Sequence, residues 1–586
     1  MSSESWLEVD PITLEVIRNS LESTVEEMGI TVQKLAHSPI FSESKDFSVA
    51  VFDAEAQLVA LAQYTPGHQG GMQSAIEATL VEIPREEMYP GDAIMMNDSY
   101  RGGLHPQDLT IFSPVFFQDE LIMYAGCVAH RVDIGGMTPG SYCPAATEIY
   151  QESIRFPCIK IMERGQMRRD ILRLFLTNIR LPEDQKGDLL AQIAALRWAE
   201  RNIQQLAAKY GLSTFKSALK GLVDLTERRT RAEIEQIPDG VYRYTDYIDH
   251  DGINDRVYEL KVAVTIKGSD VFVDFTGSSE QAEGFINSPY SLTRANSYVA
   301  FMFFLDPSIP KNQGFSRPIK VYAPPGTIFH PLPPAPLSGA TTETGGRVRD
   351  LVIGALSLAM PEKGIGTWSH SAAMAYFAGM HPRTGKRFIA IPLDGLAMGG
   401  GARSHADGYG PSHPASSNML IPNVEIIEQY YPLHYVRREI PPDAGGPGRF
   451  RGSGGLEVEW ELECPVTTMV MSNRREKPPP GVFGGQPGAP AMAWKVSRGD
   501  KTIIPQKVNA LPLEAGDRLI LRCPGGGGYG TPLERDPAAV LEDVRLGFVS
   551  AEGARRDYGV VLSADGTAVD LEATARERHG RVDEAT

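Results

Sequence analysis

Two copies of the pattern His-x-x-Asp lie close together in the stretch NDSYRGGLHPQDLTIFSPVFFQDELIMYAGCVAHRVDIGG. The first copy is His105 with Asp108, and Asp98 precedes it; the second copy is His130 with Asp133. Imidazole nitrogen and carboxylate oxygen are ligands that suit zinc or manganese. Paired glycines beside both copies let the backbone approach an ion closely and leave coordination positions open. The pattern therefore predicts a site for one divalent metal ion.

A β-hairpin is predicted to bring the two copies together. The apolar runs LTIFSPVFF and LIMYAGCVAH flank a tight acidic turn at Asp119 and Glu120. An antiparallel hairpin returns the chain to its starting level, so its two outer ends should meet. Because Asp133 follows His130 at an odd spacing, it reaches the same pocket only if the chain bends, as the glycines after it allow. The alternative is a set of hydrogen-bonded turn residues, but two copies framing one hairpin favour the metal site.

The residues before the hairpin predict elements that could support the site. Asp10 followed by proline is a helix start, and apolar residues recur at helical spacing up to about residue 38. Two alternating strands, FSVAVFD and LVALA, then flank a turn. Glu43 and Asp46 precede the first strand and His68 follows the second, so the three residues are candidates to approach the metal cluster. Taken singly, each of them is more typical of a structural turn or cap.

The whole chain is expected to be a large multidomain α+β protein. Residues 345–347, Gly-Gly-Arg, open an apolar helix and form a candidate anion cradle, although such an entrance is more often a plain turn. Composition and periodicity divide the chain into five regions: an N-terminal α+β region with the metal site (1–161), a helical segment (162–238), a mixed α/β region (239–440), a glycine-rich β region (441–532), and C-terminal helices with a polar tail frayed from about residue 573 (533–586).

Composition excludes several classes of partner. The chain has 586 residues with 57 Lys and Arg against 73 Asp and Glu, a net charge of -16. This balance disfavours nucleic acid and anionic membranes. No apolar run approaches the roughly 20 residues of a spanning helix, and the N-terminus lacks the features of a signal peptide. Five cysteines without a CxxC pair argue against a disulfide framework. A cytoplasmic protein is expected.

Motifs for binding nucleotides are missing from the sequence. There is no GxxxxGK[ST], and the run CPGGGGYGTP lacks the lysine and does not open a helix. A kinase set, a GxSxG elbow and a dinucleotide fingerprint are also missing. If the reaction consumes ATP, a partner is expected to bind it.

Six blocks of the sequence resemble the hydantoinase B/oxoprolinase family. In chain order they are KDFSVAVFDAEAQLVA with a following PGH, NDSYRGGLHPQDLTIFSPVFF, HRVDIGG, IPDGVYRYTDYIDHDG, PPDAGGPGRFRGSGG and CPGGGGYGTP. The resemblance runs from about residue 10 to about residue 560. It departs at Ser99, where many members have proline, and at the residues after His68.

The resemblance implies a two-chain enzyme. A hydantoinase A type chain would bind ATP and phosphorylate a carbonyl or enolate oxygen, and this B-type chain would complete the reaction, in a hetero-oligomer such as two A-type with two B-type chains. The family's metal ligands fall on His105, Asp108 and His130. A carboxylate nearby, Asp98 or Asp133, is expected to act as general base, with Asp133 catalytic or supporting rather than a ligand.

Three functions stay open at this point. The first is metal-assisted hydrolysis of a cyclic amide such as a hydantoin, oxoproline or a lactam, after phosphorylation of its carbonyl oxygen. The second is a subunit of an acetone or acetophenone type ketone carboxylase, in which the same metal would hold an enolate beside CO2. The third is a scaffold without catalysis, which the open ligand set disfavours because structural zinc usually takes four Cys or His ligands.

Overall fold

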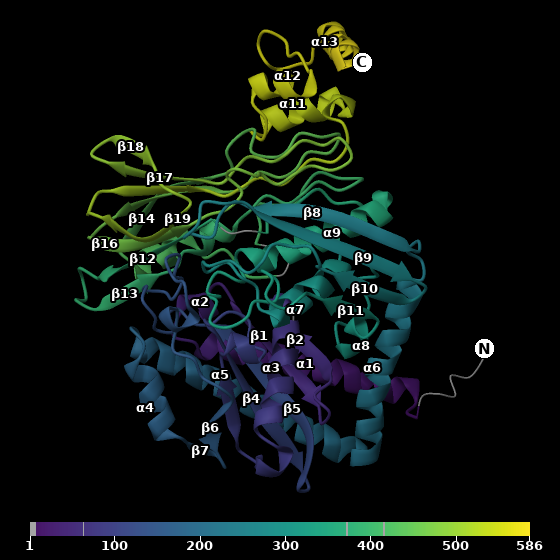
Figure 1. Cartoon of the computed structure of the whole chain (residues 1–586), viewed down its shortest axis with the longest axis vertical. Helices are drawn as coiled ribbons and strands as arrows, with labels where there is room; N and C mark the ends of the chain where they lie inside the picture. The colour runs from purple at the N-terminus through teal and green to yellow at the C-terminus, as the bar shows by residue number, and fades with distance from the viewer. Residues whose placement is uncertain (1–7, 63, 371–372, 414–416, 586) are drawn as a thin grey trace. The chain divides into compact units, whose positions relative to one another are not determined.

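The computed structural model describes residues 8–62, 64–370, 373–413 and 417–585. The chain forms two compact units, both discontinuous in sequence: unit 1 comprises Met1–Arg243, Lys261–Val348 and Ser416–Leu420, and unit 2 comprises Tyr244–Leu260, Arg349–Ala415 and Ile421–Thr586. Thirteen α-helices and four sheets are found in the described residues (Figure 1). The predicted α+β class is confirmed, and the division into five regions stays a prediction.

A seven-stranded sheet in unit 1 carries the predicted hairpin. Its spatial order is β2-β1-β5-β4-β3-β6-β7. The strands are β1 (Phe47–Asp53), β2 (Leu58–Ala62), β3 (Ala93–Met96), β4 (Asp108–Phe117), β5 (Glu120–His130), β6 (Ile159–Glu163) and β7 (Gln166–Met167). Strands β4 and β5 pair antiparallel along their whole length, so the predicted hairpin is confirmed. The predicted pair β1–β2 is confirmed as well.

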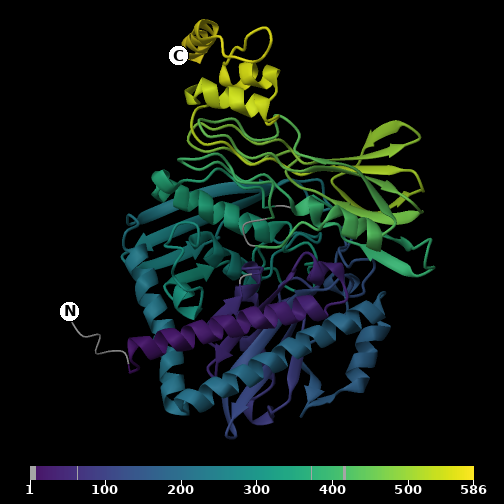
Figure 2. The ribbon, with the colours of Figure 1, turned by 180° about the vertical axis from the view of Figure 1, so that it is seen from behind.

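Helices cover both faces of this sheet. The long helices α1 (Pro11–Leu35) and α5 (Pro182–Tyr210) lie side by side against it, as Figure 2 shows. Gln192 of α5 donates to the side-chain sulfur of Cys127 on β5 at 3.5 Å. Helix α3 (Gly67–Glu82) contributes Met72 and Ile76 to a core with Tyr124 and Val128, the β5 residues that alternate with Cys127. Because side chains alternate along a strand, α3 packs on the opposite face from α5.

Capping residues set the ends of these helices as the sequence predicts. The Asp10 side chain accepts from the amides of Ile12 (3.1 Å) and Thr13 (3.0 Å), and proline occupies the first position of α1. At the end of α5, Gly211 has φ +78°, a conformation that favours glycine.

The rest of unit 1 supplies shorter elements around the sheet. The change from helix to strand predicted near residue 238 is present, because α6 ends at Ile234 and β8 begins at Gly240. A second sheet has the order β11-β10-β9-β8. The elements that lie wholly in unit 1 are η1 (Arg85–Glu87), η2 (Ser99–Arg101), η3 (Ile149–Gln151), α2 (Pro39–Ser42), α4 (Arg169–Thr177), α6 (Leu212–Ile234), α7 (Tyr290–Phe301), α8 (Gln313–Ser316), β10 (Asp270–Asp274) and β11 (Ile319–Tyr322). Three elements include residues of both units: α9 (Thr344–Ala359), β8 (Gly240–Ile248) and β9 (Tyr258–Lys267).

Unit 2 contains two further sheets, with orders β13-β12-β16-β19 and β14-β15-β20-β17-β18. Their strands are β12 (Met374–Met380), β13 (Arg387–Ala390), β14 (Leu433–Glu439), β15 (Glu457–Leu462), β16 (Val466–Met471), β17 (Met492–Ser497), β18 (Asp500–Ile503), β19 (Lys507–Leu513) and β20 (Arg518–Arg522). The helical elements are η4 (Pro361–Lys363), η5 (Leu393–Leu396), η6 (Pro532–Glu534), α10 (Val424–Tyr430), α11 (Pro537–Arg545), α12 (Ala551–Tyr558) and α13 (Leu571–Ala585).

Close backbone packing explains the glycine-rich segments of unit 2. A Cβ placed on Gly526 would lie 2.1 Å from the Gly400 carbonyl oxygen, which leaves no room for a side chain. The Gly526 amide donates to the Ser453 carbonyl at 2.9 Å, and its own carbonyl accepts from Gly446 at 2.8 Å. Extended segments therefore pair through their backbones here outside the named strands.

The polar C-terminal segment differs from the prediction. Residues from about 573 were expected to fray, but Leu571–Ala585 forms helix α13. Arg578 donates to the backbone carbonyls of Tyr558 (3.0 Å) and Arg535 (2.8 Å), and Thr574 is buried. These contacts outside the segment hold it in place, which its polar composition did not reveal.

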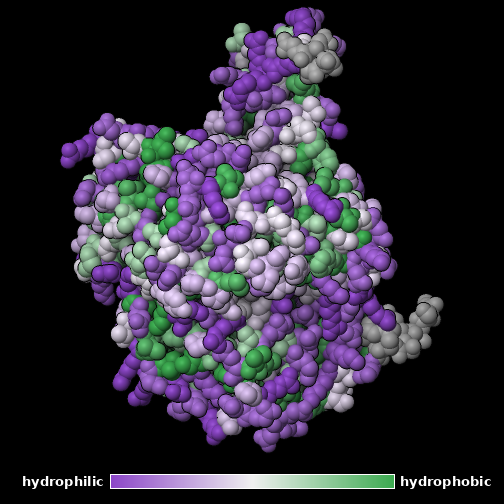
Figure 3. All heavy atoms as spheres, in the orientation of Figure 1, coloured by the Kyte–Doolittle hydropathy of each residue, from purple (hydrophilic) through white to green (hydrophobic). Residues whose placement is uncertain are grey.

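The face in Figure 3 is mostly hydrophilic, with apolar residues in small scattered groups. Within the described residues, no helix combines the length and apolarity needed to cross a membrane.

Candidate metal centre

The outer end of the hairpin places three predicted ligands in one spot of unit 1. Asp108 opens β4 and lies directly opposite His130, the last residue of β5. The Asp108 amide donates to the His105 carbonyl at 3.0 Å, so His105 and Asp108 share one tight turn before the strand begins. The buried Asn97 side chain donates to the Pro106 carbonyl at 2.7 Å and holds this turn.

The spacing of the three side chains matches a metal coordination sphere. His105 Nε2 lies 3.0 Å from Asp108 Oδ1 and 3.0 Å from His130 Nδ1, and the last two atoms are 3.5 Å apart. All three residues are buried, with ligand atoms within 4.8 Å of one another. Metal–ligand bonds of about 2.0–2.1 Å at tetrahedral angles would set ligand atoms about 3.3 Å apart. The cluster is thus arranged for one small cation.

The protonation pattern also favours a cation at the centre. His105 Nδ1 faces the Ser338 carbonyl oxygen at 3.1 Å, and since a carbonyl only accepts, Nδ1 carries the hydrogen. His105 Nε2 then presents its lone pair toward a carboxylate oxygen and another imidazole nitrogen. Three lone-pair atoms so close together repel one another unless a proton or a metal ion lies between them. Asp108 Oδ2 is buried without a hydrogen-bond partner in the described part of the chain, so the residues fit zinc or manganese.

The pKa values of Asp108 and His105 are shifted because the two buried side chains lie close together. Burial raises the pKa of Asp108, but the neighbouring His105 and His68 outweigh it and hold that pKa well below its usual range. Burial lowers the pKa of His105, yet Asp108 more than offsets this and the net pKa is raised. Asp108 is therefore an anion at neutral pH, as a metal ligand must be.

Two further residues from the supporting elements lie next to the cluster. The Asp46 carbonyl accepts from the His130 amide at 3.1 Å, just before β1. His68, in the first turn of α3, has Nε2 at 3.8 Å from Asp108 Oδ2 and 4.0 Å from Asp46 Oδ1. Burial raises the pKa of Asp46 and lowers that of His68. Both residues therefore have the position to take part, as the sequence allowed.

Asp98 holds a loop and is not among the three clustered side chains. Its carboxylate accepts from the Tyr100 amide at 3.0 Å as the cap of η2, and from Arg155 at 2.7 Å; Arg101 Nε lies at 3.3 Å. These contacts fix the turn that leads to His105.

Asp133 lies just before the bend that the sequence required. Its fully buried carboxylate accepts from the amides of Gly135 (3.2 Å), Gly140 (3.1 Å) and Arg180 (2.9 Å), and it pairs with the Arg180 guanidinium at 2.8 Å. Gly135 and Gly136 have φ of +86° and +78°. The carboxylate is thus used to anchor the loop after β5.

Two neighbours of the cluster, Tyr142 and Ser338, were not predicted from the sequence. The Tyr142 ring lies 5.7 Å from the His105 ring and 5.9 Å from the His130 ring, between centroids. Ser338 supplies the carbonyl that meets His105 from 233 residues away. Neither residue belongs to a motif with metal-site spacing, so only the fold reveals them.

The expected anion cradle at the start of α9 is closely packed. A Cβ on Gly345 would lie 2.6 Å from Leu292 and 2.7 Å from the Ala340 carbonyl oxygen. Glycine is required there by packing, and its role in binding an anion stays a prediction.

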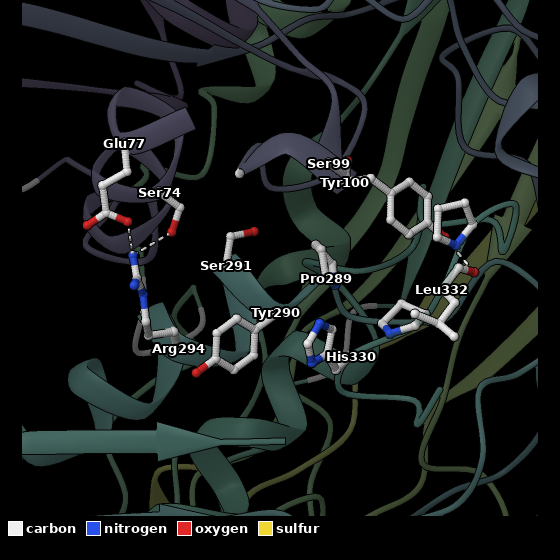
Figure 4. A pocket seen from close by; sticks show the side chains of 13 residues that line it. Ser74, Glu77, Ser99, Tyr100, Pro289, Tyr290, Ser291, Arg294, His330 and Leu332 are labelled. Atoms are coloured by element: carbon white, nitrogen blue, oxygen red, sulfur yellow. Dashed lines mark hydrogen bonds and ion pairs between the residues drawn. The ribbon is translucent and has the colours of Figure 1, made fainter. Parts of the chain in front are cut away.

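Unit 1 also has a pocket of about 400 Å³ between α3, η2, α7 and residues 330–333 (Figure 4). Arg294 reaches across it to Ser74 (2.7 Å) and Glu77 (3.1 Å), while the rings of Tyr290 and His330 stack at 4.8 Å. Because Glu77 compensates the arginine, this group offers no free charge to a ligand. None of the described lining residues belongs to the metal cluster.

The fold and the site define a class of protein: large α+β chains with a buried His-Asp-His centre on a β-hairpin. Residues 10–532 match the family Hydantoinase B/oxoprolinase, and the chain belongs to this family.

Relatives of known name cover nearly the whole chain. The beta subunit of caprolactamase from Pseudomonas jessenii is 33% identical over 581 residues, 97% of this chain and 99% of the relative. The crystal structure of the ATP-dependent caprolactamase from that organism superposes with a TM-score of 0.93, covering 98% of this chain and 100% of that chain. The B-type chain of a putative D-/L-hydantoinase from a Pseudomonas species is 32% identical, with 97% of each chain covered.

The same fold occurs in an acetone carboxylase. Its nucleotide-free structure has a TM-score of 0.90, with 21% identity, and covers 98% of this chain and 83% of that chain. At this identity the likeness concerns the fold alone.

Proposed function

We propose that this chain is the B-type component of an ATP-dependent enzyme that hydrolyses a cyclic amide. An A-type partner phosphorylates the carbonyl oxygen, and this chain completes the hydrolysis. The buried cluster of His105, Asp108 and His130 carries the proposal. The similarity to the beta chain of a caprolactamase and to the B-type chain of a putative hydantoinase supports the substrate class and the need for a partner.

The proposed chemistry explains why both ATP and a metal site are needed. An unstrained amide is a poor electrophile, and phosphorylation of its oxygen makes the carbon easier to attack. A zinc or manganese ion held by His105, Asp108 and His130 would lower the pKa of bound water toward about 7. Asp108 supplies the negative charge for the ion, and burial of the cluster keeps bulk solvent away from the reacting group.

His68 is the side chain best placed to take the proton from the attacking water. Burial lowers its pKa, so the imidazole is neutral at physiological pH. Its Nε2 lies 3.8 Å from Asp108 Oδ2, and its Nδ1 has no hydrogen-bond partner among the described residues. The base role predicted for Asp98 or Asp133 is retained as the alternative, although their contacts with arginines and backbone amides favour anchoring.

The experiment starts with the metal. We expect about one divalent ion per chain, and loss of most of it in His105→Ala with the fold retained. Stoichiometric metal in that variant would overturn the site. With a co-expressed A-type chain and ATP, we expect turnover of caprolactam, a hydantoin or 5-oxoproline.

A ketone carboxylase is the second candidate, because the acetone carboxylase shares the fold. Bicarbonate-dependent use of acetone or acetophenone, without hydrolysis of any cyclic amide, would select it. A scaffold without catalysis would show neither activity at any metal loading.

A further inference from the structure

The orientation of His105 depends on one backbone carbonyl. Ser338 oxygen accepts from His105 Nδ1 at 3.1 Å, and Gln107 Nε2 donates to the same oxygen at 3.4 Å. This contact places the hydrogen on Nδ1 and leaves Nε2 to face Asp108 and His130. A rotated peptide at Ser338 would allow the other tautomer and turn the ligand atom away.

Ser338 lies in a turn outside the helices and strands. On the far side of its carbonyl, the Gly339 amide donates to the Phe285 carbonyl at 3.0 Å. The residues before the carbonyl need another support. Glu152 supplies it: Oε2 accepts from the Leu337 amide at 2.6 Å and Oε1 from the Ser338 amide at 2.8 Å. Each carboxylate oxygen holds one of two consecutive amides. Glu152 is fully buried at the end of η3, where its own amide donates to Ile149.

We propose that Glu152 is a positioning residue for the metal centre, acting through the backbone of Leu337 and Ser338 on His105. This inference rests on the proposed metal site. The carboxylate holds the amides of Leu337 and Ser338, the position of Ser338 sets the direction of its carbonyl, and that carbonyl selects the His105 tautomer that binds metal. Burial raises the pKa of Glu152 to about 7, against the two amide hydrogen bonds, so the group is held in a strongly desolvated place.

Asp188 offers a matched control within unit 1. Its fully buried carboxylate also accepts from two consecutive amides, His37 at 2.8 Å and Ser38 at 3.1 Å. Neither of these amides belongs to a residue that meets the metal cluster. Both amides bond to Oδ1 of Asp188, whereas Glu152 uses one oxygen for each amide. The two clamps thus share a buried carboxylate that holds two consecutive amides, and they differ in what the clamped residues touch.

The test compares Glu152→Gln with Asp188→Asn in the full chain. In Glu152→Gln, one acceptor becomes an NH2 group that faces a backbone amide, so the peptide must move. We expect affinity for Zn²⁺ in calorimetry to fall about 10–100-fold, as loss of an outer partner of a ligand typically does. The visible spectrum of the Co²⁺-loaded protein should change, because a turned His105 alters the ligand field. Asp188→Asn should lower the melting temperature but keep affinity and spectrum.

Glu152→Asp keeps both acceptors on a shorter stem and should recover part of the affinity and the spectrum of the wild type. It also serves as the milder variant if Glu152→Gln does not fold. Wild-type affinity and spectrum in a folded Glu152→Gln would overturn the inference, and so would equal losses in both clamp variants. Failure of the proposed metal site itself is recognised separately, because the wild-type chain would then bind no Zn²⁺.

Discussion

Replacement of Asp108 by asparagine is the sharpest single test of the metal centre. The change keeps the size of the side chain and removes its charge. Asp108 Oδ1 lies 3.0 Å from His105 and 3.5 Å from His130, while Oδ2 has no hydrogen-bond partner in the described structure. The carboxylate is therefore expected to stabilise a bound cation more than it stabilises the surrounding fold.

The expected size of the effect follows from the place of Asp108. Loss of an outer partner of a ligand costs about 10–100-fold in metal affinity, so loss of a ligand should cost more than about 100-fold. At a metal concentration of about 100 times the wild-type Kd, binding stabilises the wild type by about 2.7 kcal/mol. At that same concentration, a variant with 100-fold weaker affinity gains only about 0.4 kcal/mol.

The assay is thermal unfolding with and without Zn²⁺ or Mn²⁺, together with calorimetry. Asp92→Asn is the matched control, because Asp92 is also fully buried and accepts from Tyr89 (3.0 Å) and Arg164 (2.7 Å) and pairs with Lys160 (2.9 Å). It should lower the melting temperature but keep the gain from metal. A metal-dependent gain in Asp108→Asn equal to that of the wild type would refute the assignment.

Three further outcomes are expected. Asp133→Asn should destabilise unit 1 by about 3–5 kcal/mol, because the partly buried Arg180 guanidinium loses the charge of its carboxylate partner; unchanged stability with about 100-fold slower turnover would instead support a general base. Burial raises the pKa of Cys127 and Cys143 to about 12, so at pH 8 a thiol reagent should modify them roughly 1000-fold more slowly than an exposed cysteine, and equal rates would contradict the burial. Arg474→Met should lower the unfolding free energy of unit 2 by about 3–5 kcal/mol, because two buried aspartates lose their arginine; a change below about 1 kcal/mol in chemical denaturation would contradict this.

Features that depend on nearby residues were predictable from the sequence. The hairpin follows from two apolar runs around an acidic turn, and its antiparallel register alone brings Asp108 opposite His130. The start of α1 and the end of α5 follow from Asp10 and Gly211, whose roles are set by the first and last turns of a helix.

Features that depend on distant residues were not predictable. Nothing near Ser338 in sequence indicates that its carbonyl meets His105, and Glu152 carries no motif that links it to the same peptide. The helix at 571–585 was not predicted for the same reason. Arg555 and Arg578 hold it through contacts with residues distant in sequence, which its own composition does not indicate.

The two His-x-x-Asp segments show how the same spacing leads to different roles. In the first segment, the Asp108 amide bonds to the His105 carbonyl, so a turn precedes the strand and both side chains face the cluster. In the second segment, His130 is the last strand residue, and Asp133 lies after the strand, just before two glycines with positive φ. There its carboxylate pairs with Arg180. Spacing therefore selects candidates, but the side of the strand end on which the aspartate falls decides whether it faces the metal or anchors the loop.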